Sequence, residues 1–154
     1  MMSITCRPAS QQDITVLNQF QRDIVRTEAP FIPGRKEEDY TYYDIAALIE
    51  SSLALVAVAE YDGKVVGSGY VQQRASRHYY KNPHHGYVGF MYSLPQYRRN
   101  GVAKSILGFL GEWARENGMD ELRLDVFAAN HSAISAYKSA GFESSMVSMR
   151  YQLT

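Results

Sequence analysis

The sequence predicts an α+β fold of three α/β/α layers, in which a mixed sheet of about six or seven strands has helices on both faces. Two patterns predict this fold. Residues 53–61 and 64–73 flank Asp62-Gly63, a dipeptide suited to the positive φ angles of a tight hairpin turn. In the second half of the chain, helical and strand patterns alternate, which is typical of helices packed on both faces of one sheet.

Each remaining element follows from the spacing of apolar residues and from residues that end helices or strands. Besides the hairpin, we expect strands over residues 4–7, 87–94, 122–126 and 147–153. We expect a first helix that begins at Ser10, with Asp13 as the acidic partner of a capping box. Further helices are expected over residues 39–50, 102–117 and 133–139, the last two closed by Gly118 and Gly141.

Length and composition exclude several classes of protein. The chain has 154 residues, which predicts a single domain over residues 1–154. Its 16 basic and 16 acidic residues leave no basic surplus, so we expect no nucleic-acid partner. The longest apolar run, residues 53–59, is far shorter than the roughly 20 residues that span a bilayer, so we expect no membrane partner.

Cysteine, histidine and the first residues bear on metal binding and location. Cys6 is the single cysteine, which excludes an internal disulfide and a multi-cysteine metal site. The four histidines are too few and too scattered to predict a zinc site, and we expect no metal. Residues 1–7 lack the cationic start and apolar core of a secretion signal, so a cytoplasmic location is expected.

A turn between an expected strand and an expected helix carries the strongest chemical signal. Residues 95–103 have the pattern Arg98-x-x-Gly101-x-Ala103. The first backbone N–H groups of a helix have no internal partner, and the helix dipole favours negative charge there. Gly101 and Ala103 leave this backbone open to phosphate oxygens. Basic residues surround the same turn: Arg98, Arg99 and Lys104.

A second segment, after the strand expected at residues 122–126, carries a spaced pattern of residues: Asn130, Ala133, Tyr137, Gly141 and Phe142. The first segment contributes Pro95, Tyr97, Arg98, Gly101 and Ala103. Together they resemble the GNAT superfamily of acyl-CoA-dependent N-acyltransferases, whose loop reads Pro-x-Tyr-Arg-x-x-Gly-x-Gly/Ala. The resemblance is strongest over residues 87–142 and extends more loosely over the whole chain.

The resemblance implies how the chain would bind acetyl-CoA as its co-substrate. In the family, a mostly antiparallel sheet contains one splayed parallel pair of strands, and the pantetheine of CoA enters the gap. This implies cofactor-binding roles for the backbone of Met91, Tyr92 and Ser93, for the turn formed by Arg98, Arg99, Asn100, Gly101, Val102, Ala103 and Lys104, and for Asn130. Tyr137 has the family's position for the acid that protonates the leaving thiolate; the alternative is an aromatic that only packs.

The sequence leaves the general base open. Many relatives have an acidic residue on the strand before the loop, but residues 87–94 contain none. His84 and His85 lie just before this strand and titrate in the useful range. Asp125 and Glu60 are other carboxylates on expected strands, and for each the alternative is a side chain that simply faces solvent. The remaining alternatives are that both histidines are solvated loop residues, or that the substrate arrives deprotonated and needs no base.

The acceptor region is acidic and aromatic. Its residues are Glu28, Glu37, Glu38, Asp39, Asp44, Tyr40, Tyr42 and Tyr43. This composition suits a cationic amine through charge and cation–π attraction, and the alternative is a solvated acidic helix face. The tail after Phe142 is short, which leaves an acceptor site that is either open or completed by a second copy in a homodimer.

These features predict an acetyl-CoA-dependent N-acetyltransferase that acts on a small-molecule amine or a protein amino group by direct attack in a ternary complex. The alternative is a non-catalytic acyl-CoA-binding or sensory module of the same fold. A dinucleotide-binding fold fits the sequence badly, because the turn lacks the Gly-x-Gly-x-x-Gly order.

Overall fold

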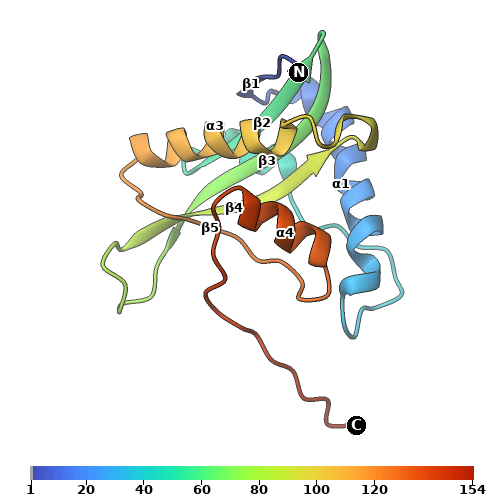
Figure 1. Ribbon diagram of the computed structural model, residues 1–154, viewed down its shortest axis with the longest axis vertical. Helices are drawn as coiled ribbons and strands as arrows, with labels where there is room; N and C mark the ends of the chain where they lie inside the picture. Colours follow the sequence, from blue (N-terminus) through green and yellow to red (C-terminus); the bar gives the residue numbers. More distant parts are fainter. Residues whose placement is uncertain (1) are drawn as a thin grey trace.

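The fold is built on one mixed sheet, as seen in a computed structural model that describes residues 2–154 (Figure 1). Five strands lie in the order β1-β2-β3-β4-β5. Their bounds are Thr5–Pro8, Ala54–Tyr61, Lys64–Ala75, His84–Ser93 and Leu122–Arg123. Neighbouring strands are antiparallel except β4 and β5, which are parallel. The mixed sheet with one parallel pair agrees with the prediction, whereas the expected six or seven strands are corrected to five.

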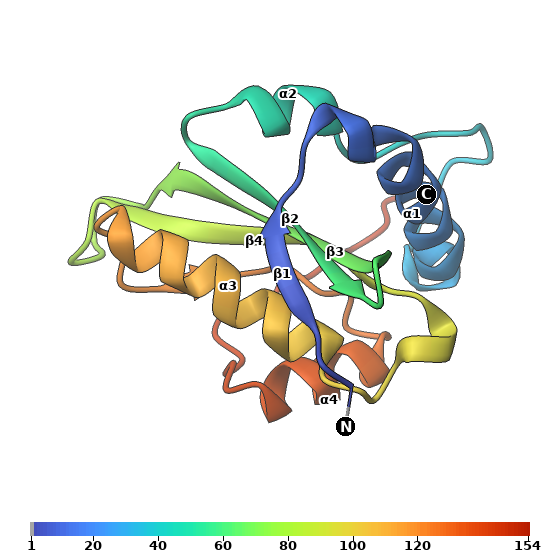
Figure 2. The same ribbon diagram turned by 90° about the horizontal axis from the view of Figure 1, so that it is seen from above.

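Helices cover both faces of this sheet, as the sequence predicts (Figure 2). The α-helices are α1 (Ile14–Glu28), α2 (Ile45–Glu50), α3 (Val102–Glu116) and α4 (His131–Ser139). Short 3-10 helices span Gln11–Asp13, Ala29–Phe31 and Pro95–Tyr97. The helices α1 and α2 lie on one face, and α3 and α4 lie on the other.

Each face of the sheet has its own apolar core. On the α3 face, Ile106 and Leu110 are fully buried against sheet residues such as Val71. On the α1 face, Leu17 and Phe20 pack against the other side of the same strands. The two cores follow from the alternation of side chains along β2, β3 and β4, which is the pattern that the sequence presents.

The hairpin turn has the geometry that its dipeptide predicts. Asp62 and Gly63 both have positive φ angles, 52° and 76°, which match the central residues of a type I′ turn. Tyr61 then pairs with Lys64 across the turn. The hairpin β2–β3 is therefore confirmed in position.

The expected helix over residues 39–50 is shorter in the structure and begins at Ile45. Asp44 caps it, because its carboxylate accepts the Ala47 N–H at 3.1 Å. The side-chain oxygen of Gln21 accepts the backbone N–H groups of Tyr42 and Tyr43 at 2.9 and 2.7 Å. Those N–H groups are therefore used by a long-range contact, and the segment before Asp44 is held outside the helix.

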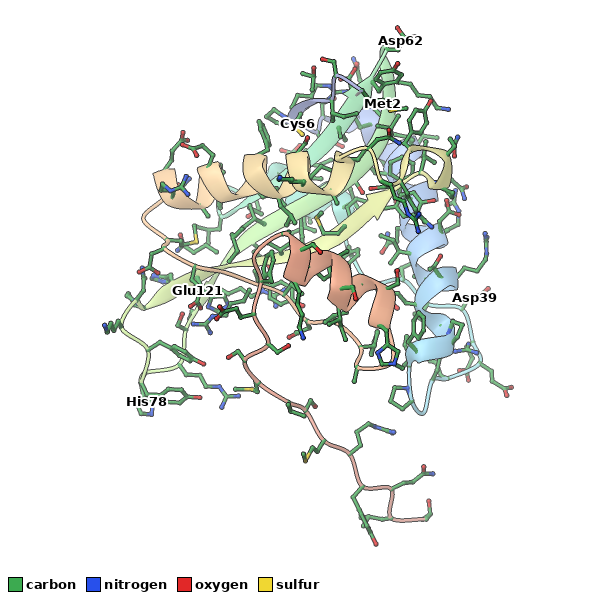
Figure 3. All side chains as sticks on the ribbon, in the orientation of Figure 1. Met2, Cys6, Asp39, Asp62, His78 and Glu121 are labelled. Carbon is green, nitrogen blue, oxygen red and sulfur yellow. The ribbon has the colours of Figure 1, made fainter. Side chains whose placement is uncertain are left out.

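The expected strand over residues 147–153 is wrong. The chain after Phe142 contains no regular element, and its apolar side chains are exposed. Val147 and Leu153 are 74% and 88% exposed, and the chain after Phe142 runs as an extended tail below the sheet and α4 in Figure 3. A strand needs a neighbour for its N–H and C=O groups, and β5 has only two residues, Leu122 and Arg123, to offer at this edge.

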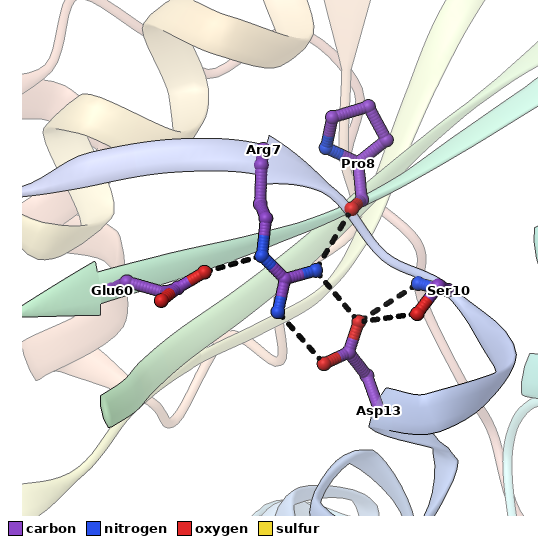
Figure 4. Close-up of polar contacts among 5 residues, drawn as sticks. All are labelled: Arg7, Pro8, Ser10, Asp13 and Glu60. Carbon is purple, nitrogen blue, oxygen red and sulfur yellow. Dashed lines mark hydrogen bonds and ion pairs between the residues drawn. The ribbon is translucent and has the colours of Figure 1, made fainter. Parts of the chain in front are cut away.

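A polar cluster joins β1, β2 and the start of α1 (Figure 4). The guanidinium of Arg7 donates two bonds to the carboxylate of Asp13, at 2.8 and 2.9 Å, and also pairs with Glu60. The same carboxylate accepts the Ser10 N–H at 2.8 Å, as the predicted capping box requires. The cluster lies at the edge of the sheet away from β5, so its role is structural.

None of the helices within residues 2–154 is both long enough and apolar enough to cross a membrane.

Candidate active site

The turn before α3 has a backbone shaped by two left-handed residues. Arg99 and Gly101 have φ angles of 65° and 84°, between the end of the Pro95–Tyr97 turn and the first residue of α3. Glycine adopts this conformation freely, whereas it is uncommon for arginine. Backbone N–H groups that follow one another through such a turn form a concave site for an anion.

The N–H groups at the start of α3 are free to bind a ligand. The first helical bond joins the Ser105 N–H to the Gly101 carbonyl at 2.9 Å. We find no acceptor for the N–H groups of residues 99–104 anywhere in residues 2–154. The Asn100 side chain donates instead to the carbonyls of Tyr97 and Arg98, at 3.3 and 2.9 Å. The turn is thus held from its carbonyl side, and its N–H groups remain uncovered.

Arg98 ties this turn to the end of β4. Its Nε donates to the Ser93 carbonyl at 3.2 Å, and its side chain is otherwise exposed. The Ser93 carbonyl is therefore engaged within the protein, whereas Arg98 keeps the two terminal guanidinium nitrogens for another partner. Arg99 and Lys104 are also exposed around the turn, so three cationic side chains surround the free N–H groups.

The strands β4 and β5 separate beside the turn. They pair only at Gly86 with Leu122 and at Tyr87 with Arg123. Beyond this point no strand is assigned next to β4 on the β5 side, in the part of the chain that the structure describes. The backbone of Met91, Tyr92 and Ser93, expected to bind the pantetheine, lies along this unpaired edge.

A bulge in β4 lies at the same place. Ser68 pairs with Tyr92 and Tyr70 pairs with Gly89, so two residues of β4 oppose one residue of β3. Phe90, within the bulge, has a φ of 58°. Its carbonyl accepts the Ser68 hydroxyl at 3.0 Å and its N–H donates to the Tyr43 hydroxyl at 3.2 Å. These two hydrogen bonds therefore hold Phe90 in its left-handed conformation.

A cavity of about 190 Å³ occupies the gap between the separated strands. Its polar side chains are two carboxylates and four tyrosines: Glu28, Asp125, Tyr42, Tyr43, Tyr87 and Tyr137. No lysine, arginine or histidine lines it among the described residues. The cavity is therefore acidic and aromatic, while the turn before α3 is basic.

Tyr137 faces this cavity from α4. Its ring packs edge-on against Phe142, with ring centroids 5.8 Å apart. Burial raises the pKa of Tyr137 to about 12, and the Glu28 carboxylate contributes to the increase. The phenol is therefore protonated at neutral pH, as a proton donor must be. The structure thus leaves both interpretations of Tyr137 in place, since its ring packs against Phe142 and the residue also lines the cavity.

The tyrosines of residues 40–43 form a connected group with the core. Tyr42 contacts Tyr43, which contacts Tyr70 and Phe90, with ring centroids 5.4–5.6 Å apart. Burial raises the pKa of Tyr43 to about 12. The Tyr42 hydroxyl is buried and has no hydrogen-bond partner within residues 2–154. An unpartnered buried hydroxyl at a cavity wall is available to a polar ligand.

Asp125 closes the cavity from the chain that follows β5. The Tyr87 hydroxyl donates to its Oδ2 at 3.1 Å. Burial raises the pKa of Tyr87, and the Asp125 carboxylate adds to this effect. The guanidinium of Arg74 lies 3.7 Å from the centroid of the Tyr87 ring. Asp125 therefore has its own donor within the protein.

The structure does not bring the candidate histidine bases to this cavity. The His85 side chain is buried at the start of β4, where its Nδ1 lies 2.9 Å from the Ser76 hydroxyl. Burial lowers the pKa of His85, and the cationic Arg123 lowers it further. His84 is exposed at the same end of the strand. In Figure 3, Glu121 marks this end of β4, and it lies well apart from Asp39, which lies beside α1.

Asn130 has a structural contact of its own. It caps α4, because its Oδ1 accepts the Ala133 N–H at 3.3 Å. Its Nδ2 remains available to a ligand. The implied contact with the cofactor therefore stays a prediction, restricted to the amide nitrogen.

The structure distinguishes among the acidic residues of the acceptor region. Glu28 lines the cavity, whereas Glu37, Glu38 and Asp39 are exposed on the connection between α1 and α2 and do not. The sequence offers one signal for this difference, since Glu28 ends an amphipathic helix just before Pro30 and so lies where a helix meets the sheet. Asp125 has no comparable signal.

A larger hollow of about 450 Å³ lies between α1 and residues 41–46. Its single carboxylate is Asp44, which already caps α2. No residue of β4, α3 or α4 lines it. The free N–H groups of α3 are remote from this hollow, so we place the candidate site at the separated strands.

The comparisons with known proteins agree with this geometry. Residues 19–142 match the model of the acetyltransferase (GNAT) family. An N-alpha-acetyltransferase of Sulfurisphaera tokodaii is 31% identical over 121 residues, which cover 74% of this chain and 71% of that protein. The chain therefore belongs to the acetyltransferase (GNAT) family.

Two shorter matches are also to proteins named as N-acetyltransferases. An uncharacterized N-acetyltransferase of Bacillus subtilis is 40% identical over 67 residues, or 42% of this chain and 43% of that protein. An aminoglycoside N(6')-acetyltransferase type 1 of Klebsiella aerogenes is 33% identical over 91 residues, or 57% of each chain. The chain thus spans about half the length of these two relatives.

Solved structures share the whole fold. A predicted acetyltransferase of Clostridium acetobutylicum, solved with acetyl-CoA, superposes with a TM-score of 0.73 at 20% identity, covering 98% of this chain and 97% of that one. The aminoglycoside 6'-N-acetyltransferase AAC(6')-IG of Acinetobacter haemolyticus gives a TM-score of 0.75 at 17% identity, covering 97% and 98%. At such identities the likeness concerns the fold.

Proposed function

We propose that the protein transfers the acetyl group of acetyl-CoA to a primary amine, by direct attack in a ternary complex. One observation carries the proposal: an uncovered, basic helix N-terminus lies next to an acidic, aromatic cavity in the gap between two parallel strands. The basic end suits a diphosphate and the acidic end suits an amine. The two ends of the gap thus have the charges that the two substrates require.

The donor would bind through the turn before α3. The free N–H groups of residues 99–104 would donate hydrogen bonds to the pyrophosphate oxygens, helped by the helix dipole. Arg98, Arg99 and Lys104 would add positive charge at the surface. The pantetheine would lie along the unpaired edge of β4 at Met91, Tyr92 and Ser93, and the Asn130 Nδ2 would bond to it. This arrangement would deliver the thioester to the cavity.

The chemistry needs a neutral amine, an oxyanion stabiliser and a proton for the leaving thiolate. A backbone N–H at the bulge of β4 would stabilise the tetrahedral oxyanion. Tyr137, which is protonated at neutral pH and faces the cavity, would give its proton to the sulfur. The position of Tyr137 supports this role, because it is the residue of α4 that lines the cavity and it carries a proton that it can donate.

The acceptor would be a cationic amine, either a small molecule or a protein amino group. The cavity has two carboxylates and four tyrosines, and such groups attract ammonium ions through charge and cation–π contacts. The names of two relatives, an aminoglycoside acetyltransferase and an N-alpha-acetyltransferase, cover both kinds of acceptor. They therefore define the panel of amines to test.

Two measurements test the proposal. Acetyl-CoA at about a hundred times its dissociation constant should stabilise the fold by about 2.7 kcal/mol in a thermal-shift experiment. Thiol release should then be followed with a panel that contains an aminoglycoside, spermidine, a peptide with a free N-terminus, and glutamate as an anionic acceptor. We expect release with at least one cationic amine, and a preference for glutamate would contradict the acceptor class.

The alternative is a non-catalytic acyl-CoA-binding or sensory module. One observation favours it: β4, the strand before the loop, carries no acidic residue. The same experiment separates the two functions, because a sensory module would be stabilised by acetyl-CoA and would release no thiol with any amine.

A further inference from the structure

Glu28 is the less exposed of the two acids that line the cavity, and the proposed chemistry has not used it. It is the last residue of α1, half-buried, and its side chain lines the cavity together with Tyr42, Tyr43 and Tyr137. It forms no ion pair with any lysine, arginine or histidine of the described chain. A carboxylate held away from water without a counter-charge is costly unless a cation comes to it.

The groups around Glu28 in the cavity do not supply this cation. Tyr42 and Tyr43 approach from the connection before α2, Tyr137 from α4, Tyr87 from β4, and Asp125 from the chain after β5. All of these are neutral or negative at pH 7. The nearest basic residue on α1, Arg26, is exposed and pairs with Asp23 at 3.5 Å.

Burial raises the pKa of Glu28, and the neighbouring Tyr42 hydroxyl opposes part of this increase. A raised pKa lies closer to the pH at which the enzyme would work, and this makes the Glu28 carboxylate a better general base. The Tyr42 hydroxyl has no partner at hydrogen-bond distance within residues 2–154, so no other acceptor competes with Glu28 for it.

We propose that Glu28 is the general base of the transfer, taking a proton from the ammonium group of the acceptor inside the cavity. This inference rests on the proposed function. It also assigns the acceptor its place, beside α1 and opposite Tyr137, so that the amine nitrogen lies between a base and the thioester.

The protons and electrons balance without a further reactant. The ammonium gives one proton to Glu28, and the nitrogen lone pair forms a C–N bond to the acetyl carbon. The C–S bond then breaks, and the thiolate leaves with the electron pair and takes the proton of Tyr137. The second proton of the nitrogen returns to Tyr137, and Glu28 releases its proton to solvent. The products are the amide, the CoA thiol and one proton.

The other titratable groups suit this role less well. Asp125 accepts a hydrogen bond from Tyr87 and is exposed, so its carboxylate is both occupied and solvated. His85 is bonded to Ser76 and lies outside the cavity. Glu28 is the carboxylate of the cavity that is half-buried and has no cation beside it.

The test compares the wild type with Glu28→Gln, which keeps the shape of the side chain but accepts no proton. The probe is the cationic amine of the panel with the highest wild-type rate. We expect kcat/KM at pH 7 to fall by about 10²–10⁴-fold in Glu28→Gln. In the variant, kcat/KM should rise about tenfold per pH unit as the neutral amine becomes available, whereas in the wild type it should level off at lower pH.

A second acceptor removes the need for the base. Trifluoroethylamine is largely neutral at pH 7, so its rate in Glu28→Gln should equal the wild-type rate within error. Binding of the cationic amine to the enzyme–CoA complex, measured by calorimetry, should weaken in Glu28→Gln. An equal loss of rate with both amines would overturn the role as base, because a structural defect would not depend on the protonation of the acceptor.

Two further variants serve as controls for the effect of Glu28→Gln. Glu116→Gln changes the same group on the exposed face of α3 and should leave the rate unchanged. Glu28→Asp keeps a carboxylate and should recover part of the rate, and its failure to do so in a folded protein would contradict the proposal. If the wild type transfers acetyl to no amine, the proposed function fails; if it does and Glu28→Gln has the same pH profile, only the base is overturned.

Discussion

Glu28 and Tyr137 line the same cavity although they come from helices on opposite faces of the sheet. The separation of β4 from β5 makes this meeting possible, because a continuous sheet would keep α1 apart from α4. The two side chains are also coupled electrostatically, since burial raises the pKa of Tyr137 and the Glu28 carboxylate adds to this increase. The cavity thus combines a candidate base from one layer with a candidate acid from the other.

Removing the hydroxyl of Tyr137 tests the acid directly. Tyr137→Phe keeps the ring that packs against Phe142, so the fold and the acetyl-CoA affinity should remain nearly intact. We expect kcat to fall by about tenfold or more, because the thiolate would lose its proton donor. Steady-state kinetics and calorimetric binding of acetyl-CoA measure the two effects separately. Unchanged turnover would reduce Tyr137 to a packing residue.

A negative charge at the start of α3 tests the anion site in a way that separates binding from folding. Ala103→Glu places a carboxylate at an exposed position in the first turn of α3, where it should raise the free energy of unfolding by about 0.3–1 kcal/mol. The same charge should repel the pyrophosphate and weaken acetyl-CoA binding by more than about tenfold. The free energy of unfolding, measured in urea, should therefore rise, whereas the acetyl-CoA affinity, measured by calorimetry, should fall.

The control for this charge is Ala46→Glu, at the exposed first turn of α2. It places a carboxylate at a comparable helix start that is remote from α3, and acetyl-CoA affinity should not change. If Ala103→Glu also leaves that affinity unchanged, the pyrophosphate does not bind at this turn.

The sequence predicts the features whose causes are local. The hairpin depends on Asp62-Gly63, because few other residue pairs adopt two positive φ angles in succession. The anion turn depends on Gly101 and on the helix that follows it. In both cases a few neighbouring residues determine the backbone, so the pattern is enough.

The features that the sequence does not predict depend on distant residues. The short α2 results from Gln21, on another helix, which binds the N–H groups of Tyr42 and Tyr43. The missing strand over residues 147–153 has a good strand pattern but no edge long enough to pair with. The sequence places Glu28 with other acids in the acceptor region, and the tertiary structure shows that Glu28 is the one of them that lines the cavity.

The Asp13 carboxylate links stability to pH. Its hydrogen bonds from Arg7, followed by the Ser10 N–H, hold the pKa of Asp13 below its usual value. A lowered folded-state pKa stabilises the fold above the unfolded pKa of about 3.9, and this stabilisation is lost as the pH falls through the folded value. Asp13→Asn should therefore cost about 1–2 kcal/mol at pH 7, allowing for the partly exposed Arg7, and less near pH 3.

Urea unfolding at the two pH values measures this difference. Asp120→Asn is the matched control, because Asp120 is exposed and makes no ion pair or side-chain hydrogen bond within the described residues. A cost for Asp13→Asn that is the same at pH 3 and pH 7 would show that the charge of Asp13 does not contribute to stability.

Gly89 tests how tightly the separated edge of β4 is packed. A Cβ at this position would overlap Cε1 of Tyr70, and that ring is itself buried against Tyr43 and Tyr87. Gly89→Ala should therefore destabilise the fold by about 1–3 kcal/mol, because neither the backbone nor the ring can move freely. Gly108→Ala, at an exposed site on α3 where a Cβ meets nothing within 4 Å, should instead stabilise it by about 0.5–1 kcal/mol. Chemical unfolding of both variants measures the two shifts. A tolerated Gly89→Ala would mean that Tyr70 can turn aside, and the cavity wall formed by Gly89 and Tyr87 would then be adaptable rather than fixed.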